Sequence, residues 1–321
     1  MSAGPFEAAN HPDHPAPIVV FAYKRPDHLR TMIDSLLGNA QASRTSVRVY
    51  CDAARKPEDE AGVEAVRGYA RSIRGFAGVT PVFREHNLGL ARSIVSGVTE
   101  MLAMHDRVIV LEDDLVLSPH FLRYMNDGLT LYAENDAVAS VHGYCYPTAS
   151  PLPETFFLRG ADCWGWGTWR RAWQHFNPDG QALLDQLQAR RLGRRFDFDG
   201  TFDFVQMLAQ QISGRNDSWA IRWHASCFLA DRLTLYPGRS LVHNGGFDST
   251  GRHCNATSQF DQSVSTVPID VRLLAAAESE PAREAFIEFF RSIRDPWPAR
   301  LRSHLRRAIS ARFPSLTRPA S

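Results

Sequence analysis

The sequence predicts an α/β fold with a mainly parallel sheet that is covered by helices on both faces. Two observations carry this prediction. Short apolar, β-branched runs alternate with stretches whose apolar residues recur at helical spacing. Polar residues also follow several of the apolar runs, and ligands gather at the carboxyl ends of strands in such sheets. A chain of 321 residues could form one large domain of this kind or two smaller ones.

The first half of the chain supplies the elements in the expected order. A strand over 18–23 leads into a helix that Pro26 opens and Gly38 closes, because proline suits a first helical position and glycine a position past the last. The remaining predicted elements are a strand over 47–51, a helical stretch to about residue 74, a strand over 79–83, a helix over 88–104, and strands over 108–111 and 138–142.

The second half of the chain differs in composition from the first. A tryptophan-rich run over 164–173 precedes a charged helical stretch over 181–195, and aromatic residues alternate with aspartates over 196–204. A glycine-rich segment over 243–253 follows. We expect this half to lie against the first half and to enclose a site between the two.

Charge and cysteine content exclude several classes of protein. The net charge of +1 combines a tail over 291–321, with eight arginines and one acid, and a body of 28 basic and 34 acidic residues. Basic charge confined to a tail is unlike a nucleic-acid-binding face, so no nucleic-acid partner is expected. The five cysteines form no CxxC motif, which indicates reduced, intracellular cysteines. Residues 1–16 are predicted to be a disordered leader without signal-peptide features, and no segment approaches the roughly 18 apolar residues of a membrane span.

Glu112, Asp113 and Asp114 are the most informative residues of the chain, because they follow a buried strand over 107–111. Adjacent carboxylates repel one another, and burial penalises their charged forms. A divalent cation would neutralise them, and oxygen ligands suit Mg²⁺ or Mn²⁺, which often also hold substrate phosphates. The alternative is that these acids cap a following helix, which Pro119 would open.

Other polar groups are expected at the same edge of the sheet, because each of them follows a predicted strand. They are Lys24 and Arg25, Asp52, and residues 84–87.

The run Val-Ile-Val-Leu-Glu-Asp-Asp-Leu-Val-Leu-Ser-Pro-His-Phe-Leu-Arg-Tyr over 108–124 resembles the metal-binding segment of GT-A glycosyltransferases, most closely the N-acetylglucosaminyltransferase I type. Ala-Tyr-Lys-Arg at 22–25 resembles the opening nucleotide-binding segment of that family. Val-Tyr-Cys-Asp at 49–52 and Arg-Glu-His-Asn-Leu-Gly at 84–89 resemble two further segments. The resemblance implies a GT-A, Rossmann-like fold whose second half binds the acceptor.

For the carboxylate cluster, the resemblance implies one role per residue. Asp114 would bind the Mn²⁺ or Mg²⁺ that bridges the donor diphosphate. Asp113 would contact the ribose or the donor sugar, and Glu112 the sugar.

For the nucleotide, the resemblance implies contacts from Arg25, Asp52, Arg84 and Asn87. Asp52 would accept from a pyrimidine N–H, which favours a UDP donor. The alternatives are that Asp52 is a turn residue, that Arg25 is a solvated residue before a helix, and that Arg84 pairs with Glu85 or Glu112.

On the acceptor side, Trp164 and Trp166 resemble the Gly-Trp segment of the same enzymes, and indole faces suit the apolar faces of sugar rings. The run Asn-Asp-Ser-Trp that ends at Trp219 resembles the family's Asp-Asp-Trp, which carries the catalytic base. An inverting transfer needs a base within hydrogen-bond reach of the acceptor hydroxyl, and Asp217 is the predicted base. The alternatives are that the tryptophans belong to the core and that Asp217 caps a helix starting at Ser218.

A second metal ligand is predicted at His253, because imidazole can join a carboxylate site for Mn²⁺ and the glycine-rich segment could close over the donor. His243 is the other candidate, and either could be a plain loop residue. The basic tail reads as an amphipathic helix over 301–313 that would lie on an anionic membrane surface. A solvated, partly disordered end is the alternative.

The sequence therefore predicts a metal-dependent, inverting glycosyltransferase at the cytoplasmic face of the membrane or in the cytoplasm. It would move a sugar, GlcNAc by the nearest resemblance, from a UDP-sugar to a saccharide, lipid-linked or protein-linked glycan in surface polysaccharide synthesis. The expected division is a leader over 1–16, a nucleotide-sugar-binding half over 17–150, an acceptor-binding half over 151–258 and a basic helical tail over 259–321. The alternatives are a sugar-nucleotide nucleotidyltransferase, which normally needs a glycine-rich loop after its first strand, and a non-catalytic nucleotide-sugar-binding protein.

Overall fold

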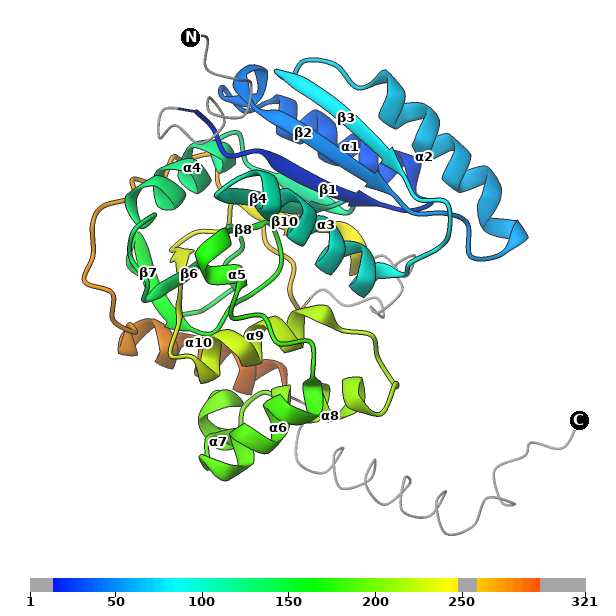
Figure 1. The fold of residues 1–321 in the computed structure, drawn as a ribbon. Coiled ribbons are helices and arrows are strands. Elements are labelled where there is room, and N and C mark those ends of the chain that lie inside the picture. The colour runs from blue at the N-terminus through cyan, green and yellow to red at the C-terminus, as the bar shows by residue number, and fades with distance from the viewer. Residues whose placement is uncertain (1–13, 248–258, 295–321) are drawn as a thin grey trace, which may run out of the picture.

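The computed structural model describes residues 14–247 and 259–294, and within them one eight-stranded sheet runs through both halves of the chain (Figure 1). The order of its strands is β3 (Gly78–Phe83), β2 (Ser46–Cys51), β1 (Ile18–Ala22), β4 (Arg107–Glu112), β8 (Trp166–Trp169), β6 (Val138–His142), β9 (Leu233–Pro237) and β7 (Thr155–Arg159). Only β8 and β7 run antiparallel to their neighbours. The predicted mainly parallel α/β sheet is confirmed.

Helices cover both faces of this sheet, as predicted. Helices α1 (Pro26–Leu37) and α2 (Glu60–Ser72) contact each other on one face of the sheet, and α3 (Leu90–Met104) lies on the other, as expected for right-handed crossovers. In Figure 1, α3 lies in front of the strands and α1 behind them. The other helices are α4 (Phe121–Leu131), α5 (Arg170–Trp173), α6 (Gly180–Ala189), α7 (Gly193–Phe196), α8 (Phe204–Ile212), α9 (Trp219–Leu229) and α10 (Glu280–Ile293).

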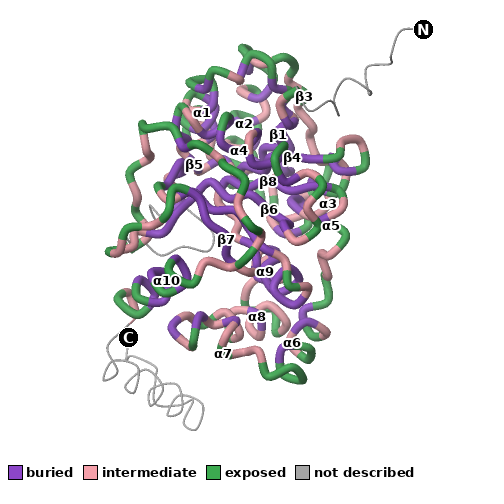
Figure 2. The backbone as a smooth tube through the Cα atoms, turned by 90° about the vertical axis from the view of Figure 1, so that its left-hand side faces the viewer, coloured by how far each residue is buried: buried purple, intermediate pink, exposed green. Residues whose placement is uncertain are grey.

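The predicted strands of the first half lie within two residues of their expected bounds, because their β-branched runs are buried on both faces. All five residues of β1 and of β6 are buried, and the strands at the centre of the molecule are buried along most of their length (Figure 2). Arg25 and Asp52 follow the ends of β1 and β2, and the carboxylate cluster lies at the end of β4. The parallel sheet therefore brings those residues to one edge.

A separate two-stranded sheet joins the carboxylate cluster to the second half of the chain. It pairs β5 (Leu115–Leu117) with β10 (Val242–Asn244) in antiparallel register, with Leu115 opposite Asn244. Because β5 follows Asp114 directly, the acids do not cap α4, which begins only at Phe121. The helix-cap alternative for the cluster is therefore wrong.

A helical module, α6 to α9, lies beside the sheet (Figure 1). Its helices share a hydrophobic cluster of their own, separate from the main core. Buried members of this cluster are Leu183, Leu187, Phe196, Leu208, Ile221, Ala225, Phe228 and Leu229. In the part of the chain that the structure describes, no helix is both long and apolar enough to cross a membrane.

Candidate functional site

A cavity of about 670 Å³ lies where the carboxyl ends of β1, β2 and β4 face the helical module. Nine of the residues predicted to form the site line it: Arg25, Asp52, Asn87, Glu112, Asp113, Asp114, Trp164, Asp217 and Trp219. The fold thus brings together residues that are separated by almost 200 positions in the sequence.

Arg25 neutralises the carboxylate cluster. Its Nη2 donates to Asp113 Oδ1 at 2.5 Å and to Asp114 Oδ2 at 2.8 Å. Its Nη1 is buried and has no hydrogen-bond partner among the described residues. Burial opposes the charged form of Arg25, but the charges of Asp113 and Asp114 outweigh it and raise the pKa of the guanidinium. Arg25 is therefore held charged, with one donor unused.

Burial raises the pKa values of two carboxyl groups of the cluster, Glu112 and Asp113. Burial, helped by the charges of Asp114 and Asp113, raises the pKa of Glu112 to about 8. Burial also raises the pKa of Asp113 to about 6, although the charge of Arg25 opposes this shift. A single arginine thus compensates three neighbouring acids only in part.

Asp52 organises the loop before α3. Its carboxylate accepts backbone N–H bonds from Ala53, Leu88 and Gly89 at 2.9, 2.9 and 3.0 Å. Gly89 has a positive φ of 73°, a conformation that glycine adopts without strain. Asn87 completes this loop by donating from Nδ2 to the carbonyl of Ala53 at 2.7 Å. Asp52 therefore holds the turn before α3. Among the described residues, about one of its four acceptor positions has no donor.

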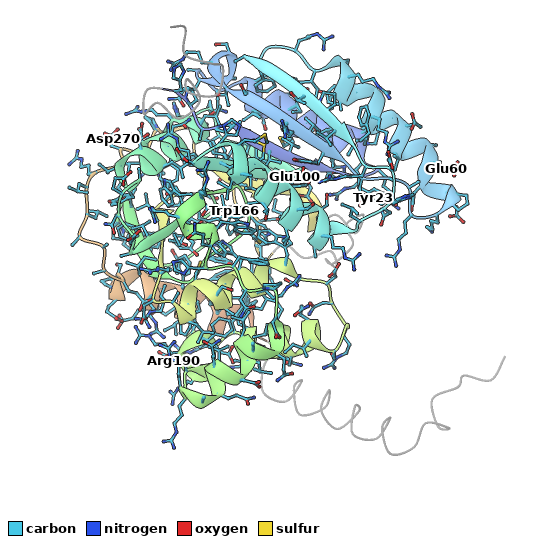
Figure 3. The ribbon with its side chains drawn as sticks, viewed as in Figure 1. Tyr23, Glu60, Glu100, Trp166, Arg190 and Asp270 are labelled. Atoms are coloured by element: carbon cyan, nitrogen blue, oxygen red, sulfur yellow. The ribbon has the colours of Figure 1, made fainter. Side chains whose placement is uncertain are left out.

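Arg84 does not line the cavity, in contrast to the nucleotide contact expected for it. Its Nη2 donates to Ser96 Oγ and to Glu100 on α3, and its guanidinium lies 4.6 Å from the centroid of the Tyr50 ring. Glu100 is labelled in Figure 3. Arg84 does pair with a glutamate, as the alternative proposed. The partner is Glu100 on α3, and not Glu85 or Glu112.

Trp166 also differs from its expected place on the acceptor side. It belongs to the central strand β8 and is fully buried, at the centre of the molecule in Figure 3. Its ring stacks on Trp219 at 5.3 Å and lies 6.0 Å from Trp223. Trp166 packs against Trp219, which lines the cavity. Trp166 is therefore a core residue, as the alternative proposed.

Asp217 lines the same cavity as the carboxylate cluster, from the turn between α8 and α9. The alternative role of helix cap is filled by Ser218, whose Oγ accepts from the N–H of Ile221 at 3.2 Å. Asn216 holds the turn by donating to the carbonyl of Met207 and by accepting from the N–H of Ser218, each at 3.1 Å. Among the described residues, the Asp217 carboxylate makes no hydrogen bond or ion pair. It is exposed and open to a ligand.

The donor atoms around Asp114 suit a hard cation. Asn244 and Gly246 line the cavity beside it, and the N–H of Gly245 donates to the Asp114 carbonyl at 2.8 Å. Side-chain oxygens of Asp114, Asp113 and Asn244 are ligands that Mg²⁺ and Mn²⁺ prefer. Among residues 14–247 and 259–294, no three acidic, histidine or cysteine side chains form a metal-binding group.

The predicted histidine ligand lies outside the described residues, since 248–258 includes His253. The other candidate, His243, belongs to β10, and its Nδ1 donates to the carbonyl of Gln262 at 3.1 Å. His243 does not line the cavity.

Gly246 provides a test of the cation site. A Cβ at Gly246 would lie 2.4 Å from Asp114 Oδ2 and 3.1 Å from Asn244 Oδ1. Gly246→Ala is therefore expected to displace Asp114 and to weaken Mn²⁺ binding by roughly tenfold or more, measured by titration calorimetry with the metal alone. Gly68→Ala is the matched control, because a Cβ at Gly68 meets no atom within 4 Å. Equal Mn²⁺ affinities of the two variants would remove Asp114 from the metal site.

Lys24, Arg55 and Lys56 form a basic part of the cavity lining that the sequence did not predict as a group. Tyr23 donates to Asp59 Oδ2 at 2.8 Å and accepts from the N–H of Arg55, while Lys24 donates to Asp59 Oδ1 at 2.7 Å. Lys56 lines the cavity beside them. Tyr23 is labelled in Figure 3. Asp59 gave no sequence signal, because its partners are more than 30 positions away.

His142 fixes the backbone of Trp164. It is fully buried in β6, and its Nε2 accepts the Trp164 N–H at 3.0 Å. Burial lowers the pKa of His142 from 6.5 to about 4. The unfolded chain therefore takes up a proton between about pH 6.5 and pH 4 that the folded protein does not bind. The free energy of unfolding is expected to fall as the pH falls through this window.

His142→Gln keeps an acceptor for the Trp164 N–H but does not titrate. It is expected to reduce the acid sensitivity of stability by up to about 1.4 kcal/mol per pH unit, the linkage value for one proton. Urea unfolding near pH 7 and near pH 5 measures this difference. The buried His224, whose pKa is also lowered by burial, contributes equally in both proteins. Parallel pH dependences of wild type and variant would show that His142 is not the titrating group.

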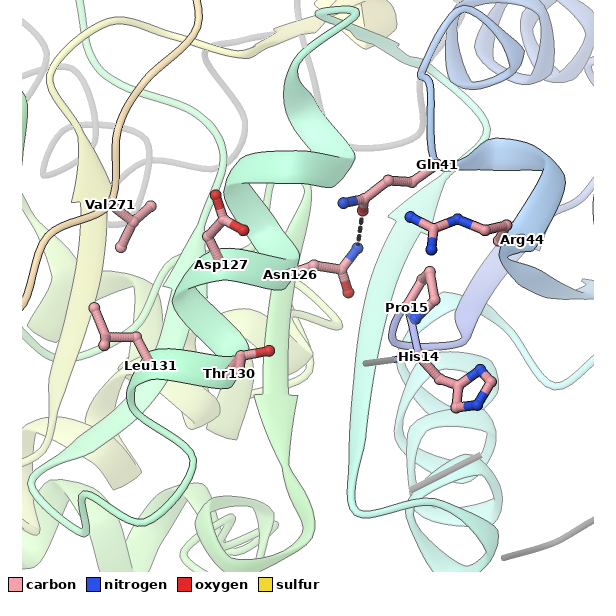
Figure 4. Close-up of a pocket in the computed structure, with 9 residues that line it drawn as sticks. All are labelled: His14, Pro15, Gln41, Arg44, Asn126, Asp127, Thr130, Leu131 and Val271. Atoms are coloured by element: carbon pink, nitrogen blue, oxygen red, sulfur yellow. Dashed lines mark hydrogen bonds between the residues drawn. The ribbon is translucent and has the colours of Figure 1, made fainter. Parts of the chain in front are cut away.

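A second hollow, of about 330 Å³, lies between residues 14–15, the segment that holds Gln41 and Arg44, helix α4 and Val271 (Figure 4). Asn126 and Gln41 line it and bond to each other, with Asn126 Nδ2 donating to Gln41 Oε1 at 2.6 Å. Arg44 and Asp127 are its charged lining residues. None of the residues predicted to form the site lines this hollow.

No known family model matches the chain. No curated protein matches it. Among solved structures, the chain is similar to the mannosyltransferase PcManGT from Pyrobaculum calidifontis in complex with GDP-Man and Mn²⁺, at 14% identity over 71% of this chain and 73% of that one, with a TM-score of 0.38. It is also similar to TarS from S. aureus, at 15% identity over 45% of this chain and 24% of that one, with a TM-score of 0.30.

A third similar structure is a putative glucose-1-phosphate thymidylyltransferase from Bacillus anthracis in complex with a sucrose. The identity is 11% over 50% of this chain and 74% of that one, with a TM-score of 0.29. The match thus spans about a quarter of TarS but about three quarters of the other two proteins. All three likenesses are distant, and none of them assigns a function to this chain.

Proposed function

We propose that the chain is a metal-dependent glycosyltransferase that moves a sugar from a nucleoside diphosphate donor to a hydroxyl group, with inversion at the anomeric carbon. One observation carries the proposal. A single cavity is lined by a carboxylate cluster with a charged arginine, from the ends of β1 and β4, and by Asp217, from the turn between α8 and α9. Among the described residues, the Asp217 carboxylate makes no hydrogen bond or salt bridge. The chemistry of such a transfer needs these two features on opposite sides of the donor sugar.

The first wall suits a diphosphate. Arg25 Nη1 is a buried donor without a partner among the described residues, so an anionic oxygen would satisfy it. Asp114 and its oxygen-bearing neighbours would hold a divalent cation, and the cation when bound would neutralise charge on the leaving diphosphate. Lys24, Arg55 and Lys56 add positive charge to the same wall.

The turn between α8 and α9 suits a base. As the acceptor oxygen attacks the anomeric carbon, the bond from that carbon to the diphosphate oxygen breaks, and its electron pair leaves with the nucleoside diphosphate. The acceptor proton moves to a carboxylate oxygen of Asp217. Arg25 stabilises the charge that develops on the departing diphosphate. Attack from the face opposite the leaving group inverts the anomeric configuration.

The donor we propose is a UDP-sugar, with UDP-GlcNAc as the first candidate by the sequence resemblance. The open acceptor position of Asp52 suits the N–H of uracil, while its other positions hold the loop before α3. The acceptor is a saccharide hydroxyl, free or carried on a lipid or a protein.

A thermal-shift screen of UDP-, GDP- and TDP-sugars, with and without Mn²⁺, tests the proposal. Donor binding stabilises the folded state by mass action, so a correct donor should raise the melting temperature only when Mn²⁺ is present. Asp114→Asn keeps the size of the side chain and removes its charge, and it should abolish the Mn²⁺-dependent shift. A wild type that responds to no nucleotide sugar, or a variant that responds equally, would refute the proposal.

Product analysis separates the alternatives. A transferase releases a nucleoside diphosphate and a glycoside, whereas a nucleotidyltransferase releases pyrophosphate. Saturable donor binding without either product, over a panel of acceptors, would indicate a non-catalytic binding protein.

A further inference from the structure

We infer that the cavity wall built by α8 and the start of α9 is an acceptor subsite for an uncharged saccharide. We call it the α8–α9 wall, and its members are Met207, Gln210, Asp217, Trp219 and Ala220. The inference rests on the proposed function and adds the chemical class of the acceptor. Met207 and Gln210 were not among the residues that the sequence singled out.

The distribution of charge in the cavity carries the inference. Its cationic lining residues, Lys24, Arg25, Arg55 and Lys56, all lie at the ends of β1 and β2. Within the described residues, the α8–α9 wall contributes no cation and one carboxylate. A phosphate or carboxylate on the acceptor would therefore face Asp217 with no cation of this wall lining the cavity beside it, and like charges at short range are costly.

The arginines nearest to this wall along the chain donate to neutral protein groups. Arg222 donates to the carbonyls of Ser218 and Pro178, each at 3.3 Å, and its charge interacts with that of Asp217. Arg215 donates to Ser213 Oγ at 3.0 Å. Neither side chain lines the cavity.

The polar groups of the α8–α9 wall suit sugar hydroxyls. The side-chain amide of Gln210 and the carboxylate of Asp217 make no hydrogen bond within the described part of the chain. An amide offers both donors and an acceptor, and a carboxylate accepts from a hydroxyl. The apolar surface of Met207, Trp219 and Ala220 matches the C–H face of a sugar ring.

The wall is held as one unit. Asn216 bonds α8 to the cap of α9 through Met207 and Ser218, with Asp217 between these two contacts. Leu208 and Ile221 tie the two helices together through the hydrophobic cluster of the helical module. The acceptor groups and the proposed base therefore keep a fixed spacing.

Saturation-transfer NMR with simple glycosides tests the inference on the full-length protein without donor. The neutral probes are methyl β-glucopyranoside and methyl N-acetyl-β-glucosaminide, and the anionic probes are methyl β-glucuronide and glucose 6-phosphate. We expect the neutral probes to bind about tenfold or more tightly than the anionic ones. Equal or tighter binding of the anionic probes, or no saccharide signal at all, would overturn the inference.

Gln210→Lys supplies the cation that the wall lacks, so it should reverse the preference in favour of the anionic probes. Gln206→Lys is the matched control, because Gln206 is exposed on the same helix and does not line the cavity. Identical behaviour of the two lysine variants would also overturn the inference. Circular dichroism verifies that both variants fold.

Different measurements test the glycosyltransferase proposal and the acceptor-subsite proposal, so one can be rejected without the other. Loss of the Mn²⁺-dependent nucleotide response would reject the glycosyltransferase, whereas the saccharide measurement needs neither donor nor metal. A normal nucleotide response with no neutral-sugar preference would reject the subsite alone.

Discussion

Asp217→Asn is expected to lower the rate of sugar transfer by roughly 10²–10⁴-fold, the usual contribution of a general base. The amide has the size of the carboxylate but cannot take the acceptor proton. Donor binding should be unchanged, because Arg25 and Asp114, which we propose to hold the donor, bond to each other and not to Asp217. The measurement is the turnover number with saturating donor and acceptor, together with the Mn²⁺-dependent thermal shift.

Ser218→Ala is the control for this prediction. It removes the side-chain cap of α9 next to Asp217 and should cost about 1 kcal/mol of stability. Because the carboxylate stays in place, transfer should remain close to that of the wild type at a temperature where both proteins are folded. An Asp217→Asn enzyme with wild-type turnover would place the base on another residue.

The part of the cavity that holds Arg25, Asp52 and Asp114 could be predicted from the sequence, because these residues lie at the ends of strands. A buried strand is recognisable from its apolar run, and a parallel sheet brings successive strand ends to one edge. Arg25, Asp52 and Asp114 were therefore expected together, and they line one cavity. Their catalytic and binding roles stay predictions.

The second half of the site was harder to predict, because its placement depends on tertiary packing. The run that contains Trp166 is the central antiparallel strand β8, and no local pattern distinguishes such a strand from an aromatic loop. Met207 and Gln210 reach the cavity only because α8 docks on α9 through the helical module. Arg84 was misplaced because its partner Glu100 is 16 positions away.

Arg25→Met is expected to destabilise the protein by about 3 kcal/mol near pH 8 in the absence of metal, since it leaves buried carboxylates without their counter-charge. The side chains of Asp113 and Asp114 are only 6% and 16% exposed, so water screens them little. Near pH 5 the loss should be smaller, because Asp113, with a pKa of about 6 even beside Arg25, is then protonated. Urea unfolding at the two pH values measures both effects.

Manganese should restore most of this loss, and that rescue separates a cation site from an ordinary ion pair. In the wild type, Arg25 and a metal compete for the Asp114 carboxylate, so the variant should gain more stability from Mn²⁺ than the wild type does. Lys24→Met is the control, because Lys24 pairs with Asp59 while 42% of its side chain is exposed. That change should cost much less stability than Arg25→Met and be insensitive to Mn²⁺. If Mn²⁺ stabilised both variants equally, Asp113 and Asp114 would be structural partners of Arg25 and the metal would bind elsewhere.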